Sequence, residues 1–112
     1  MAKSEQVQSV AVSATADGDN TIVAAPAAGY KIRVLGYALN VNAAGTVQWK
    51  SGAATAKSGA MEFPDGGGIA PGFIDPSTGG FWFECAAAEA LVLATSAGVD
   101  GLGHVSYLVT RA

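Results

Sequence analysis

Short stretches of alternating hydrophobic and polar residues follow one another along this chain, separated by turn-forming residues. The clearest stretch covers residues 29–42, and the hydrophobic side chains that recur there at every second position are Leu35, Tyr37, Leu39 and Val41. No window repeats hydrophobic residues at the spacing of an α-helix. Because a period of two is typical of strands with one buried face, the pattern predicts an all-β protein.

The alternation predicts seven well-marked strands, at residues 7–14, 21–25, 29–42, 46–50, 80–85, 90–95 and 104–111. Residues 51–76 are rich in glycine and proline, and their short apolar pieces at 60–63 and 69–70 predict two edge strands, since proline cannot donate to a central ladder. The sequence Ala-Asp-Gly-Asp-Asn at 16–20 predicts a turn that joins the first two strands in a hairpin. About eight strands in a chain of this length predict an antiparallel, jelly-roll-like β-sandwich.

The third predicted strand changes its apolar face part-way along. Ile32 and Val34 share one parity, whereas Tyr37 and Leu39 share the other. A change of face by one residue beside Gly36 predicts a β-bulge, or a strand that crosses between sheets.

The last predicted strand carries apolar groups on both faces. Val105, Tyr107 and Val109 alternate with a second set that includes Leu108. This pattern predicts a central strand with one side on the core and the other on a neighbouring subunit. Together with the small number of charged residues, it predicts a homo-oligomer, with a trimer as the expected state.

The chain has 112 residues, the usual length of one domain, and we assign residues 7–112 to the sandwich. Nine acidic and six basic residues give a formal net charge of −3, and the scattered bases form no stripe that could follow phosphates. There is neither a run of about 18 apolar residues nor the apolar core of about 7–15 residues that a secretory signal needs. We therefore expect a soluble, cytosol-made protein with neither a nucleic-acid nor a membrane partner.

Few residues are candidates for chemistry. Cys85 is the only cysteine, which excludes an intrachain disulfide and favours a buried small side chain. His104 is the only histidine and is expected to be a hydrogen-bonded structural residue, although a use as a pH switch stays open. Asp17 and Asp19 resemble the start of a calcium loop, but the twelfth position counted from Asp17 is Ala28 rather than glutamate, which favours turn chemistry. We expect no catalytic, cofactor-binding or metal-binding residue.

The aromatic residues divide between two faces. Trp49, Tyr37 and Leu39 are expected in the core. Alternation places Phe81 with Phe83 on one face and Trp82 on the opposite one, so core packing is expected for the two phenylalanines. Trp82 is left for a second sheet face, a subunit interface or a ligand platform.

Several packing and turn motifs resemble those of small tailed-bacteriophage virion proteins that consist of one β-sandwich. The resemblance covers residues 30–109, and its most specific pieces are IRVLGY (32–37), VQWKSG (47–52), AEALVLATS (88–96) and GHVSYLV (103–109). These motifs carry no catalytic residue. The resemblance implies a head-decoration or cement-like protein on the surface of the virion head, although it leaves placement on the tail open.

The implied mechanism is adhesive: trimers sit on a preformed shell and bridge major capsid protein subunits. A polar N-terminal arm, residues 1–6, is expected to be flexible in the free protein and to become ordered on the shell. The alternatives are a tail or fibre module that binds a host glycan or another tail subunit, an enzyme, and a non-viral binding domain. The residues expected at the interface are Ala2, Lys3, Ser4, Glu5, Gln6, Trp82 and Leu108.

Overall fold

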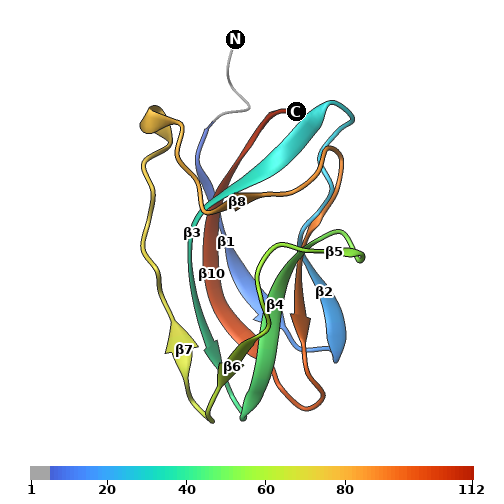
Figure 1. Cartoon of the computed structure of the whole chain (residues 1–112), viewed down its shortest axis with the longest axis vertical. Helices are drawn as coiled ribbons and strands as arrows, with labels where there is room; N and C mark the ends of the chain where they lie inside the picture. The colour runs from blue at the N-terminus through green and yellow to red at the C-terminus, as the bar shows by residue number, and fades with distance from the viewer. Residues whose placement is uncertain (1–5) are drawn as a thin grey trace.

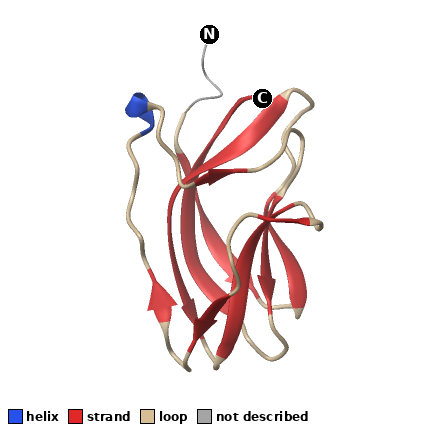
Figure 2. Ribbon diagram, in the orientation of Figure 1, coloured by secondary structure: helices blue, strands red, loops and turns tan. Residues whose placement is uncertain are grey.

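The computed structural model describes residues 6–112, apart from the side chain of Thr78, and within them the chain is almost entirely β-structure. Two antiparallel sheets pack face to face as a sandwich (Figures 1 and 2). The only helical element in this part of the chain is the 3₁₀ turn Pro76–Thr78, so none of its helices is long and apolar enough to cross a membrane. The strands are β1 (Gln8–Ala14), β2 (Gly18–Val23), β3 (Tyr30–Val41), β4 (Gly45–Ser51), β5 (Thr55–Ala56), β6 (Met61–Phe63), β7 (Gly68–Ile69), β8 (Phe83–Glu84), β9 (Leu91–Thr95) and β10 (Gly101–Arg111).

The strands pair in a nested order. One sheet, called sheet A here, runs β1-β10-β3, and both β7 and β8 pair with the far edge of β3. The other, sheet B, runs β2-β9-β4, and both β5 and β6 pair with β4. Thus β1 pairs with β10, β2 with β9, β3 with β8 and β4 with β6. The predicted all-β sandwich is confirmed, and this nesting is compatible with a jelly roll.

The core lies between the sheets and is built from the alternating side chains of the long strands. Trp49 of β4 is completely buried, and its indole makes an edge-on contact with Tyr37, with ring centroids 5.3 Å apart, and a tilted one with Phe83 at 6.0 Å. Leu39 is 4% exposed and belongs to the same cluster. The prediction of a buried core position is confirmed for Trp49 and Leu39, whereas Tyr37 is half-buried and packs against the core cluster.

The predicted change of face in β3 is a β-bulge. Tyr107 of β10 faces Val34, whereas the preceding Ser106 faces Gly36, so Leu35 is the additional residue. Because of this extra residue, Val34 before it and Tyr37 after it both contact the core. Leu35 itself is fully buried but lies outside the inter-sheet cluster, which corrects its expected place on the face of Tyr37 and Leu39.

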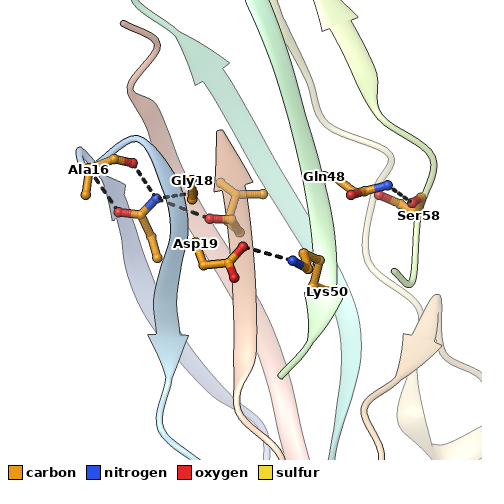
Figure 3. A network of polar contacts seen from close by, with 8 residues as sticks. Ala16, Gly18, Asp19, Gln48, Lys50 and Ser58 are labelled. Carbon is orange, nitrogen blue, oxygen red and sulfur yellow. Dashed lines mark hydrogen bonds and ion pairs between the residues drawn. The ribbon is translucent and has the colours of Figure 1, made fainter. Parts of the chain in front are cut away.

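The first predicted hairpin is wrong, although the turn is correct. Asn20 closes the turn: its side-chain amide donates to the carbonyls of Ala16 and Gly18, and its Oδ1 accepts from the Ala16 amide (Figure 3). However, β1 pairs with β10 in sheet A and β2 with β9 in sheet B, so the turn joins the two sheets as an arch. Val12 of β1 and Ile22 of β2 therefore reach the same core from opposite sheets.

The glycine- and proline-rich region forms edge strands, as predicted, but three of them: β5, β6 and β7. The last strand also starts earlier than predicted, at Gly101 rather than at His104, because Gly101 and Gly103 pair with both β1 and β3. Its central position in sheet A is confirmed.

A half-buried ion-pair cluster holds the start of β3 to β8. Glu84 accepts hydrogen bonds from Lys31 Nζ at 2.9 Å and from Arg33 Nε at 2.7 Å. Burial alone would raise the pKa of Glu84, but the hydrogen bonds and positive charges of Lys31 and Arg33 outweigh it and hold the pKa below its ordinary value of 4.5.

We predict that Glu84→Gln lowers the free energy of unfolding at pH 7 by about 1 kcal/mol, because the two cations lose their charged acceptor. A carboxyl whose pKa is lower in the folded state stabilises the fold above its unfolded pKa, and this contribution is lost as the pH falls through the folded value. Urea unfolding from pH 7 down to about pH 3 measures it, and the wild type and Glu84→Gln should converge at the acid end. A difference that grows on acidification would contradict the assigned direction.

Candidate interaction surface

The connection from β7 to β8 runs along the outside of the sandwich instead of crossing its core (Figure 1). We call residues 68–82 the outer segment. It is attached to β3 by backbone hydrogen bonds from the Ile74 amide to the Leu35 carbonyl at 2.9 Å and from the Trp82 amide to the Val34 carbonyl at 2.8 Å. The pairing of β7 with Leu39 and Asn40 attaches its other end. The outer segment is therefore fixed to the sheet at three places.

Glycines let this segment approach sheet A closely. A Cβ at Gly36 would lie 2.7 Å from the Gly72 carbonyl oxygen, and one at Gly68 would overlap the Leu39 carbonyl oxygen. Side chains at these two positions would push the segment away from the sheet. The sequence therefore allows backbone to pack on backbone here, which determines where the outer segment lies.

Three hollows lie between the outer segment and the outer face of β3 and β10. The largest has a volume of about 350 Å³, and Ile69 and Leu102 are among its walls. The second shares Ala38 and Ala70 with the first, and the two thus form one shallow groove. Small and apolar residues dominate its lining, so this groove is suited to contact with a surface rather than to catalysis.

Three aromatic side chains of the outer segment face solvent. Phe73 is 57% exposed, Trp82 45% and Phe81 38%, and we call these residues the aromatic rim. The Trp82 Nε1–H donates to the Gly72 carbonyl at 3.1 Å, and the Arg33 guanidinium lies over the Phe81 ring, 4.8 Å from its centroid. These contacts hold the rings in place while leaving much of their area uncovered.

The expectation that both Phe81 and Phe83 pack in the core is only half correct. Phe83 packs against the core, as expected, but Phe81 does not. The predicted strand 80–85 is formed only at Phe83–Glu84, so alternation does not extend back to Phe81. Trp82 faces away from the core, as expected.

Leu108 does not offer the free apolar surface that the sequence predicted for it. It is only 4% exposed, and it shares the third hollow with residues of the outer segment, among them Pro76 and Ser77. The chain itself therefore covers this side of β10, so Leu108 offers little surface to a neighbouring subunit. Of the predicted arm, Gln6 is exposed, whereas Ala2, Lys3, Ser4 and Glu5 lie outside the described residues.

The residues considered for chemistry are widely separated or already paired. His104 is exposed beside the second hollow, and its imidazole makes no hydrogen bond to any described residue, contrary to the expected structural role. Asp17 accepts a hydrogen bond from the Gly98 amide, and Asp19 forms an ion pair with Lys50 at 3.0 Å (Figure 3), so both carboxylates have partners.

Cys85 belongs to the core, as predicted, and burial raises the pKa of its thiol. Within residues 6–112, no group of three or more metal-ligating side chains converges.

The sequence interpretation missed Phe73, Ile69 and Leu102 as surface residues. Phe73 and Ile69 stand in the segment Gly-Ile-Ala-Pro-Gly-Phe-Ile-Asp-Pro, where the prolines and glycines prevent a long strand and leave isolated apolar residues without a regular face. That isolation is the signal that could have found them. Leu102 had none, because it lay before the predicted start of the last strand, whereas β10 begins at Gly101.

No protein-family model matches this chain, and no curated protein is significantly similar to it in sequence. The function must therefore be argued from the surface just described.

Proposed function

We propose that this protein is a non-enzymatic structural component of a bacteriophage virion, which decorates the head and stabilises it by bridging major capsid protein subunits. The single observation that carries the proposal is the aromatic rim, a group of large apolar side chains outside the core. Tryptophan and phenylalanine are enriched at protein–protein interfaces, and exposed apolar groups of this size favour contact with another protein. The resemblance of residues 30–109 to virion proteins supplies the kind of partner.

The way in which the rim is held suits adhesion. Because backbone hydrogen bonds attach the outer segment to β3, its rings lose little conformational freedom when a partner covers them. Only 13% of the chain is charged, against about 25% for an average soluble domain, which lowers the cost of covering its surface. In this proposal the protein is made in the host cytoplasm and acts on the head surface.

A tail or fibre module that binds a glycan is the second candidate, because exposed aromatic rings can also stack on sugars. In the part of the chain that the structure describes, the aromatic pairs in contact are Tyr37–Trp49 and Trp49–Phe83, both in the core. No ring contact joins Phe73, Phe81 and Trp82 into one flat platform. This arrangement favours a protein partner over a sugar.

The test is co-sedimentation of the purified protein with empty phage heads that lack it. We predict that Trp82→Ala weakens this binding at least about tenfold, as expected when an anchoring aromatic is removed, while the melting temperature stays within about 3 °C of the wild type. Trp82→Phe, which keeps an apolar ring, should bind with an intermediate affinity. Thr55→Ala, at an exposed position of β5 in the other sheet, is the matched control and should bind normally.

Binding of Trp82→Ala to the heads at wild-type affinity would contradict the proposed use of the rim. If the wild type fails to bind heads but binds an oligosaccharide in a Trp82-dependent manner, the tail-module alternative is supported instead.

A further inference from the structure

β1 is a free edge strand without the usual protection. Within residues 6–112 it ends sheet A and pairs with β10 alone, so every second residue directs its backbone N–H and C=O away from the sheet. Its seven residues include no charged side chain and no proline, and its pairing with β10 has no irregularity. Ser9, Ala11 and Ser13, which point outward, are small and exposed. An edge of this kind is ready to pair with another strand.

The other edges of the sandwich differ from β1. β2, at the same side of sheet B, carries Asp19 in an ion pair and has a register irregularity between Thr21 and Val23. β5, β7 and β8 are two residues long, and β6 has three residues, one of them Glu62. Short strands, charges and irregularities are the features by which natural sheets prevent pairing at their edges. β1 alone among the described strands combines length, regularity and absence of charge at an edge.

The five central residues of β1 read the same in both directions, although Gln8 and Ala14 at its ends differ. Residues 9–13 are Ser-Val-Ala-Val-Ser, with Ala11 at the centre. Two copies of such a strand can pair antiparallel about a two-fold axis so that each residue meets one of its own kind. In a contact between two identical chains, residue i of one copy meets residue j of the other and residue j meets residue i, so the repeat of serine and valine on both sides of Ala11 matches each of these pairs in size.

We propose that β1 pairs with β1 of a second copy of this chain, which joins two A sheets into one continuous sheet across a two-fold axis at Ala11. In this register Ala11 faces Ala11 of the partner subunit. The other pairs are Val10 with Val12 on the core side and Ser9 with Ser13 on the outer side.

The charge and the exposure of the residues around β1 favour a second copy of this chain as its partner. The net charge of −3 makes two copies repel each other on average, yet residues 6–16 carry no charge, so the approach along β1 brings no like charges into direct contact. Val10 is only half-buried in the single chain and Val7 is 40% exposed, and a second β1 would cover part of both. A strand of seven residues is about 24 Å long, so this interface is small and the dimer is expected to be weak and reversible.

Sedimentation equilibrium of the full chain at pH 8 tests the proposal. The wild type should be a dimer at a protein concentration of about 500 µM and should dissociate on dilution, because a small interface gives a weak dimer. Ala11→Lys should raise the dissociation constant at least about tenfold, since two lysines then face each other across the axis. Thr21→Lys, which adds the same charge to an exposed position of β2, is the matched control and should associate like the wild type.

Mixing makes the test specific for the two-fold axis at Ala11. Ala11→Glu alone should also be monomeric, but an equimolar mixture of Ala11→Lys and Ala11→Glu should form a heterodimer. A variant that had merely lost its fold would not recover in this way. With a mild oxidant, Ala11→Cys should form a disulfide-linked dimer, because residues directly opposite in a sheet lie within disulfide distance, whereas Ser9→Cys should do so only when mixed with Ser13→Cys.

Four outcomes would overturn the proposal. They are a wild type that stays monomeric at the highest concentration, association that Ala11→Lys leaves unchanged, a mixture of the lysine and glutamate variants that does not associate, and a wild-type trimer. The same experiment therefore also tests the trimer that the sequence predicted.

Discussion

Trp49→Ala is expected to lower the free energy of unfolding by about 3–5 kcal/mol, the range for removing a large buried aromatic side chain. Trp49 of sheet B is 0% exposed and touches Tyr37 and Phe83, which both belong to sheet A, so its removal leaves a cavity between the two sheets. Because the site lies within the packed core cluster, its walls are expected to relax only partly into the cavity. Urea unfolding followed by far-ultraviolet circular dichroism gives the value.

Trp82→Ala is the control, because it removes the same side chain from the surface. Trp82 is 45% exposed, and its loss should cost less than about 1 kcal/mol, mainly through the hydrogen bond to the Gly72 carbonyl. If Trp82→Ala were the more destabilising of the two, the division between core and aromatic rim would be wrong.

Gly103→Ala should be the second large effect, with a loss of about 2–4 kcal/mol for a single added methyl group. Gly103 lies in β10 between β1 and β3 with a φ of 147°, a value that side-chain-bearing residues rarely adopt. A Cβ there would overlap the carbonyl oxygen of Ala38 on the neighbouring strand. Because that atom belongs to the backbone of a central strand, relief requires the two strands to move apart.

Gly59→Ala is the matched control, since a Cβ at Gly59 meets nothing within 4 Å and its φ is not in the left-handed region. It should change the free energy of unfolding by less than about 0.5 kcal/mol, the usual size for a surface substitution. Chemical denaturation of both variants measures the difference. Equal stability of the two would mean that β10 and β3 are not as close at Gly103 as described.

Part of the fold could be predicted because it depends on local pattern. A strand with one buried face must alternate, so the long strands were found within a few residues of their true ends. The bulge at Leu35 was also visible, since a change of parity between Val34 and Tyr37 can keep one face on the core only if one residue is added. Trp49 followed from the same alternation, whereas the burial of Cys85 followed from its residue type.

Pairing of the strands could not be predicted in this way. The turn at Asn20 has the same side-chain chemistry in a hairpin and in an arch, so residues 16–20 do not reveal that β1 and β2 lie in different sheets. The choice between hairpin and arch depends on residues far away in the sequence, because β10 is the partner of β1 and β9 is the partner of β2. The candidate site was found only in part for the same reason: Trp82 was predicted to face away from the core, but Phe73 and Phe81 join it only because of the path of the outer segment.

The sequence by itself determined the class of fold, the approximate positions of the long strands, the change of face in β3 and the core tryptophan, because each depends on neighbours along the chain. Only the tertiary structure decided which strands pair, that the outer segment covers Leu108, and that β1 is left as an uncovered edge. These features depend on contacts between residues distant in sequence, and the alternation of one strand does not specify its partner. The symmetric sequence of residues 9–13 is visible without a structure. It suggests pairing between two copies only because the structure places β1 at the edge of its sheet.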